Sequence, residues 1–225
     1  LGCVLLVPAL RWLPPPDTSG LTTSGQKLQD KPPSPLYLRV FMAVYFCTGF
    51  GYVVSVTFIV AIVNQLPGLD GRGNLAFLAI GVGAAPACIV WDLVARRTGD
   101  LNALIVAAVL QIVGILLPVL VPGLWAAMLG SLLFGGTFIG MVSLVLSMAG
   151  RYYPSMPAKM MGKMTLSYGV AQIIGPAITG MIGAKFGTYN AGLYVAAGVM
   201  VLGTGLLFVL KAVELRDARG VFGLL

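Results

Sequence analysis

Fifty consecutive residues without a charged side chain, LNALIVAAVLQIVGILLPVLVPGLWAAMLGSLLFGGTFIGMVSLVLSMAG, occupy positions 101–150. A helix that crosses a bilayer needs about 20 mainly apolar residues, so this stretch is long enough for two spans. Pro122 and Gly123 lie near its middle and are typical of a turn. We therefore expect two transmembrane helices, over 101–121 and 123–149, joined as a tight hairpin.

The rest of the chain repeats this apolar pattern. Further transmembrane helices are expected over 38–63, 73–91, 161–184 and 188–211. Of the 225 residues, 58% are hydrophobic and only 9% are charged, which is too few charges to cover the surface of a soluble domain. The sequence predicts an all-α, polytopic membrane protein with a bundle of six transmembrane helices over 38–212.

The segments outside this bundle are expected to differ in character. Residues 1–10 are apolar but too short to span a bilayer, and we interpret them as the tail of a preceding transmembrane helix. Residues 11–37 are polar and rich in proline, as linkers are. Residues 213–225 are expected to form a tail. Twelve Lys and Arg residues lie on the side of the linker and the tail, against only Arg72 and Lys185 on the other side, which predicts that linker and tail are cytoplasmic.

Several classes of function are disfavoured by composition. The chain has no histidine, and its three cysteines show no metal-ligand spacing, so we expect no metal and no cofactor. An intramembrane enzyme would need a convergent set of catalytic groups that these spans do not offer. The formal net charge of +7 is explained by topology and anionic lipid, and we expect no nucleic-acid partner.

Polar residues recur at helical spacing in two of the expected spans. The first stripe consists of Tyr45, Thr48, Tyr52 and Ser55. The second includes Tyr168 and Gln172, together with Thr165, Gly175 and Thr179. Polar groups within a membrane face a wet cavity or bond to neighbouring helices. We expect Tyr45, Thr48, Tyr52, Ser55, Tyr168 and Gln172 to be candidates for a substrate cavity, with interhelical hydrogen bonding as the alternative, favoured for the serines. Gln111 is alone in its span, which favours a packing role.

Small residues are expected to form helix contacts or hinges. Gly136 and Gly140 make a GxxxG pair, which lets two helices approach closely. Gly49 lies between Tyr45 and Tyr52. A proline within a membrane helix permits a kink, and Pro176 follows Gly175 and precedes Gly180 in the fifth span.

The sharpest local feature is the segment Trp91-Asp92-Leu93-Val94-Ala95-Arg96-Arg97. An acid followed after four residues by two arginines can bridge helix ends by charge-assisted hydrogen bonds. The alternative is a positive anchor at the cytoplasmic surface.

These residues resemble the loop motif of the major facilitator superfamily (MFS), with its acid at Asp92 and its basic pair at Arg96 and Arg97. Cys88, Leu93 and Ala95 stand where that motif has Gly, Arg and Gly. The segment 45–58 is similar to the seventh helix of the bacterial YbfB/YjiJ-type subfamily. The chain thus resembles the C-terminal half of an MFS transporter. The resemblance implies a cytoplasmic gating loop at Asp92, Arg96 and Arg97, and it places both polar stripes beside a central cavity.

The function expected from this resemblance is secondary active transport of a small solute by alternating access across the bacterial inner membrane. The expected partners are membrane lipid, a missing N-terminal six-helix half and an unidentified small-molecule substrate. The alternative is a six-helix scaffold or subunit that does not transport and pairs with another chain.

Overall fold

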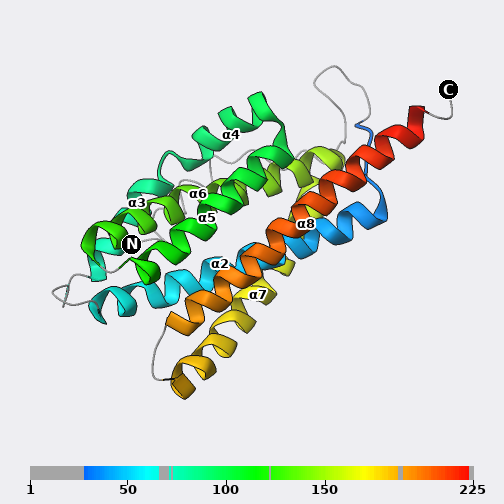
Figure 1. Ribbon diagram of the computed structural model, residues 1–225. Coiled ribbons are helices and arrows are strands. Elements are labelled where there is room, and N and C mark those ends of the chain that lie inside the picture. The colour runs from blue at the N-terminus through cyan, green and yellow to red at the C-terminus, as the bar shows by residue number, and fades with distance from the viewer. Residues whose placement is uncertain (1–27, 66–70, 72, 122, 187–189, 223–225) are drawn as a thin grey trace, which may run out of the picture.

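The computed structural model describes residues 28–65, 71, 73–121, 123–186 and 190–222, and these residues form seven α-helices (Figure 1). The helices are α2 (Pro35–Gln65), α3 (Gly73–Ala84), α4 (Ala87–Thr98), α5 (Asp100–Leu120), α6 (Leu124–Tyr152), α7 (Pro157–Phe186) and α8 (Asn190–Phe222). The expected helix tail at 1–10 and most of the expected linker lie outside the described residues.

Five of the helices are long and apolar enough to cross a membrane, namely α2, α5, α6, α7 and α8. The expected continuous span over 73–91 is instead a broken one, because α3 and α4 meet at 44° across Ala85 and Pro86. Proline has no N–H to donate and its ring clashes with the carbonyl four residues earlier. Composition across the break is uniformly apolar, which is why hydropathy alone predicted one helix.

The first long helix begins earlier than expected. Pro35 is its first residue, and its fixed φ suits that position. The Ser34 hydroxyl accepts a hydrogen bond of 3.3 Å from the Tyr37 N–H, so Ser34 acts as the N-cap. The last residues of the expected linker, 35–37, therefore belong to α2.

The last helix continues beyond its expected end at 211. The segment Lys211-Ala212-Val213-Glu214-Leu215-Arg216 consists mainly of strong helix formers, and the described part of the expected tail is helical as far as Phe222. Lys211 Nζ donates to Asn102 Oδ1 at 2.7 Å, which fastens this part of α8 to α5.

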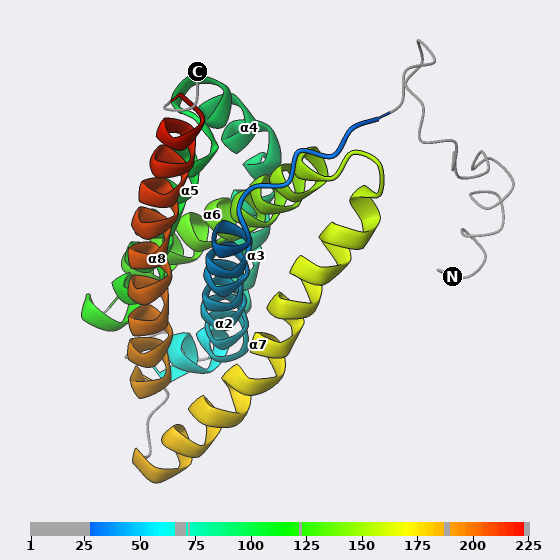
Figure 2. The same ribbon diagram turned by 90° about the vertical axis from the view of Figure 1, so that its right-hand side faces the viewer.

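The helices form two closely packed groups. In one, α2 packs between α7 and α8, and in the other α6 packs between α3 and α5; Figure 2 shows the α7, α2 and α8 arrangement. Glycines bring the α6 group together, since a Cβ at Gly135 would collide with the Ile80 carbonyl of α3. On the other side of α6, a Cβ at Gly130 would lie 2.8 Å from the Gly114 carbonyl oxygen of α5.

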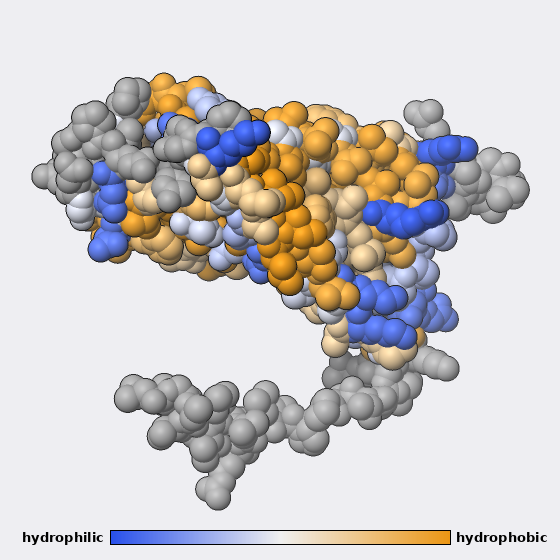
Figure 3. Space-filling model, turned by 90° about the horizontal axis from the view of Figure 1, so that it is seen from below, coloured by the Kyte–Doolittle hydropathy of each residue, from blue (hydrophilic) through white to orange (hydrophobic). Residues whose placement is uncertain are grey.

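The surface fits a lipid environment. In Figure 3, hydrophobic residues cover the middle of the visible face and hydrophilic residues gather mainly toward its ends. Apolar side chains such as Leu78, Ile173 and Trp125 are largely exposed, which a bilayer tolerates and water does not. We call the end that carries Arg96, Arg97, Arg151 and Lys211 the basic end.

Candidate functional site

An aromatic cluster joins α2, α6 and α7 in the middle of the bundle. We call it the aromatic face, and its members are Tyr45, Tyr52, Phe134, Phe138 and Tyr168. The Tyr52 ring stacks on Phe138 with centroids 4.6 Å apart. Tyr45 and Tyr168 approach to 4.7 Å, and Tyr52 lies 6.0 Å from Tyr168. The rings therefore form one continuous aromatic surface across three helices.

Only part of this surface is accessible. Tyr45 and Tyr168 are buried, with 2% and 8% of their surface exposed. Tyr52, Phe138 and Gln172 are half-buried, and Gln172 lies four residues after Tyr168 on α7. A small molecule reaching this face would meet a phenol, a phenyl ring and an amide.

Two residues of the first expected stripe do not belong to the aromatic face. Thr48 is 1% exposed and its hydroxyl donates to the Val44 carbonyl at 3.1 Å, within its own helix. Ser55 is 4% exposed and lines a small internal cavity. The expectation that these two face a substrate cavity therefore differs from the structure, because neighbouring helices cover that side of α2.

Two of the expected packing glycines, Gly49 of α2 and Gly175 of α7, lie where these helices meet. A Cβ at Gly49 would stand 2.7 Å from the Tyr168 carbonyl oxygen, and one at Gly175 would stand 2.9 Å from Val53. Pro176 is inside α7. A Cβ at Gly180 would meet nothing within 4 Å. Among the described residues, no helix therefore packs against Gly180 as expected.

The GxxxG pair of α6 faces the broken span. A Cβ at Gly140 would collide with the Trp91 ring, and one at Gly136 would lie 3.4 Å from the Gly83 carbonyl oxygen. Trp91 Nε1 donates to the Gly136 carbonyl at 2.7 Å. The two glycines thus form a slot that receives the Trp91 side chain from α4.

Two of the three residues of the expected gating loop pair with each other within a single helix. Arg96 Nε donates to Asp92 Oδ2 at 2.7 Å, but both residues lie on α4 and their side chains are 74% and 55% exposed. No ion pair joins Arg97 to another described residue. In this conformation the acid of the motif therefore bridges no helix ends, because Arg96 one turn away occupies it.

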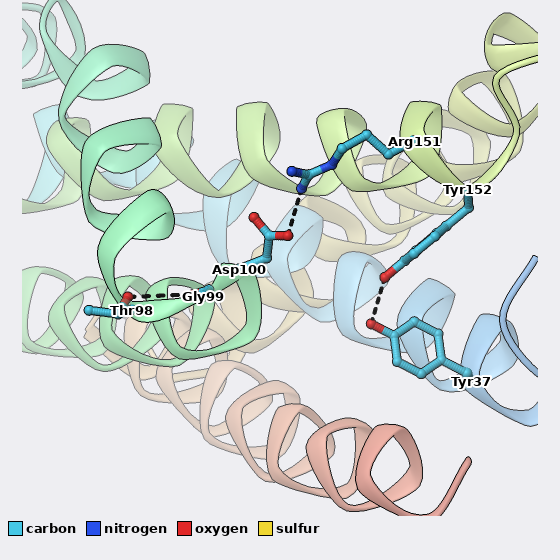
Figure 4. A network of polar contacts seen from close by, with 6 residues as sticks. All are labelled: Tyr37, Thr98, Gly99, Asp100, Arg151 and Tyr152. Atoms are coloured by element: carbon cyan, nitrogen blue, oxygen red, sulfur yellow. Dashed lines mark hydrogen bonds and ion pairs between the residues drawn. The ribbon is translucent and has the colours of Figure 1, made fainter. Parts of the chain in front are cut away.

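A different polar network fastens the basic end, and sequence reasoning missed it. Arg151 of α6 donates to Asp100 of α5 at 2.6 Å, and the hydroxyls of Tyr37 and Tyr152 are hydrogen-bonded at 2.9 Å. Figure 4 shows both contacts side by side. Together they connect the start of α2, the start of α5 and the end of α6.

The segment before α2 is also held at this end. Asp30 accepts hydrogen bonds from the Ser155 N–H and hydroxyl at 3.0 and 2.7 Å, and the Lys31 N–H donates to the Tyr152 carbonyl at 3.1 Å. The sequence did contain a signal for the contact of Asp100 with Arg151, because an acid begins one helix of the hairpin and an arginine ends the other. A contact 125 residues apart, such as that of Asp30, has no such signal.

The structure of a POT family transporter, PepTSo, solved by in meso crystallography, shares this fold. The match has a TM-score of 0.69 and 14% sequence identity, and it covers 80% of this chain. The chain spans 38% of that transporter's chain. No curated protein matches the sequence.

A protein-family model described as "Uncharacterised MFS-type transporter YbfB" matches residues 1–208. This match covers the whole described bundle except the end of α8. It agrees with the all-helical fold, with the spans of a multi-pass membrane protein and with the structural match. The chain therefore belongs to the YbfB-type family of MFS transporters.

Proposed function

We propose that this chain is the C-terminal half of a secondary transporter that moves a small amphipathic solute by alternating access. One observation carries the proposal, namely the aromatic face on α2, α6 and α7 with Tyr52, Phe138 and Gln172 partly accessible. In an alternating-access cycle one bundle moves against the other around a site near the membrane midplane. The half that would complete the cavity is a six-helix N-terminal bundle.

The chemistry of this face favours a solute with a planar apolar group and a neutral polar group. Aromatic rings attract other rings and apolar groups, while the Gln172 amide and the Tyr52 hydroxyl offer donors and acceptors. The central parts of α2, α5, α6, α7 and α8 contain no charged residue. This half of the cavity therefore supplies no counter-ion for an ionised solute.

The distribution of basic residues supports an orientation for the bundle. The basic end would face the cytoplasm, and the end of α7 and the start of α8 would face the opposite side, in the inner membrane of a bacterium. Cationic side chains are favoured on the cytoplasmic side of membrane proteins.

Accessibility labelling tests alternating access without knowledge of the solute. In the complete transporter polypeptide lacking native cysteines, Gln172→Cys and Tyr52→Cys would be treated with a membrane-impermeant maleimide in right-side-out and inside-out vesicles. We expect labelling from both sides, since each conformation opens the face to one side. We expect Ile173, the residue after Gln172, to face lipid, because its apolar side chain is 77% exposed on this bundle. Ile173→Cys is therefore the matched control, since a water-soluble reagent should not reach it.

The other results would each contradict the proposal in a distinct way. Labelling from one side only would show a cavity that does not alternate. Absence of labelling at both positions would place the aromatic face in a permanent protein interface, as expected for a scaffold subunit.

Solute chemistry is tested with a panel of neutral and cationic planar amphiphiles in a binding assay. Tyr52→Leu removes a ring stack worth about 0.5–1.5 kcal/mol, so we expect affinity for the best neutral probe to fall roughly 2- to 10-fold. Tyr52→Phe keeps the ring and isolates the hydroxyl. Thr57→Ala, at an exposed position of the same helix, should leave affinity unchanged.

A further inference from the structure

Two buried serines in the bundle lack the hydrogen bonds that comparable residues make. The buried threonines Thr48, Thr137, Thr179 and Thr204 each donate to the carbonyl four residues earlier in their own helix. Ser55 and Ser131 are 4% and 1% exposed, and neither hydroxyl oxygen has a partner among the described residues. A buried hydroxyl without a partner is unfavourable, so a missing partner needs an explanation.

Both serines line the same small internal cavity. Ser55 reaches it from α2 and Ser131 from α6, and Gly114 and Ile115 of α5 form another part of its wall. The cavity has a volume of about 10 Å³, which is room for a single water molecule. Most of the residues that line it are apolar, but Ser55 and Ser131 bring to it two buried hydroxyls without partners, and such groups are what a buried water binds.

The Gly114 carbonyl is a third polar group beside the cavity, and a proline leaves it without its usual hydrogen-bond donor. Pro118 is inside α5 and has no N–H to donate to the Gly114 carbonyl, which therefore lacks its normal helical donor. The Gly114 carbonyl oxygen is directed toward α6, since a Cβ at Gly130 would lie 2.8 Å from it. Gly130 also lines the cavity. At Gly130 no side chain covers this carbonyl.

We infer that the cavity between Ser55, Ser131 and the Gly114 carbonyl holds one bound water molecule. The water accepts a hydrogen bond from each hydroxyl and donates one to the carbonyl, which gives the three bonds that buried waters typically make. A cation is disfavoured, because no carboxylate lines the cavity and a buried charge without a counter-charge is strongly unfavourable. The water thus connects α2, α5 and α6, and this site does not depend on the transported solute.

Serine-to-alanine substitutions in the complete transporter polypeptide distinguish a cavity that holds water from an empty one, because they change the thermal unfolding midpoint in opposite directions. If water is bound, Ser55→Ala and Ser131→Ala each lower the thermal unfolding midpoint in detergent, because the water loses a partner. The double variant then loses less than the sum of the single losses, since both hydroxyls bind the same water. Ser147→Ala, at an exposed position of α6, is the matched control and should leave the midpoint unchanged.

Other outcomes overturn the inference. In a dry cavity each substitution removes an unpaired hydroxyl, so an unchanged or raised midpoint excludes the water. Strictly additive losses exclude a shared one. A density map of the unmodified protein that resolves ordered waters is the deciding measurement where the variants disagree. We expect one isolated peak within hydrogen-bond distance of the three groups, and a map without that peak rejects the site.

Discussion

The guanidinium of Arg151 lies 2.6 Å from the carboxylate of Asp100, and the two residues stand at the end of α6 and the start of α5. Each charge is at the helix terminus that favours it, because a helix N-terminus attracts an anion and a C-terminus attracts a cation. The side chains are 59% and 32% exposed. The ion pair therefore fastens the open end of the α5–α6 hairpin where its helices meet water.

The first prediction concerns this ion pair. Asp100→Asn should lower the free energy of unfolding by about 0.2–1 kcal/mol, the usual contribution of a partly exposed pair. The charge swap Asp100→Arg with Arg151→Asp should restore only part of the loss, since each charge then opposes its helix dipole. Chemical or thermal unfolding in detergent measures both effects.

Asp92→Asn is the matched control for that experiment, because it removes an acid whose only ion-pair partner among the described residues is on its own helix. Its effect should be smaller than that of Asp100→Asn, near the 0.3–0.5 kcal/mol typical of such pairs, as a rough guide. An equal or larger loss for Asp92→Asn would show that Asp92 fastens helices together in a conformation other than this one.

The second prediction compares two glycines of the expected packing set. Gly140→Ala should destabilise the protein by about 1–3 kcal/mol, because its Cβ would collide with the buried Trp91 ring and displace it from its hydrogen bond to the Gly136 carbonyl. Gly180→Ala should raise stability by up to about 1 kcal/mol, since alanine is the better helix former and its Cβ meets open space. Equal effects in an unfolding assay would mean that the α4–α6 contact is loose.

The third prediction concerns Gln111, which is fully buried in α5 with neither amide atom hydrogen-bonded among the described residues. Gln111→Met keeps the shape of the side chain and removes two unpaired polar atoms. We expect stability to increase by about 1–3 kcal/mol, the penalty for leaving such groups unbonded. A decrease in the unfolding midpoint would show that the amide binds a group such as an ordered water.

The fourth prediction concerns the connection between α4 and α5. Gly99 has φ 89° and ψ 152°, a region that is essentially limited to glycine. Gly99→Ala should cost about 1–3 kcal/mol of stability. Gly99→Asn should give no rescue, because asparagine tolerates the left-handed helical region and not this one. Gly198→Ala, on α8 with open space around its Cβ, is the control and should not destabilise.

The helical segments were largely predictable because charge is so sparse in this chain. Intervals without Lys, Arg, Asp or Glu mark the spans, and the ends of the helices lie close to the first charges or turn residues. The break at Pro86 was not predictable in the same way. Pro118 and Pro176 also lie in apolar stretches of sequence, yet both are inside continuous helices. Tertiary packing therefore decides which proline interrupts a span.

The polar stripe of α2 shows why helical spacing alone does not decide which side chains reach a shared surface. Tyr45 and Tyr52 are seven residues apart and so are Thr48 and Ser55, but the two pairs are offset by three residues. Three residues rotate a helix by about 300°, which leaves the pairs roughly 60° apart. The two tyrosines therefore reach the aromatic face, while the hydroxyl pair turns toward neighbouring helices.

The spans without charge have a consequence for energetics across an energised membrane. Moving one elementary charge through a potential of 100 mV involves about 2.3 kcal/mol. The central segments of this bundle carry no ionised side chain, so their motion transfers no protein charge through the electric field. Any dependence of the cycle on voltage must then come from the solute, from a coupled ion or from residues of the other half.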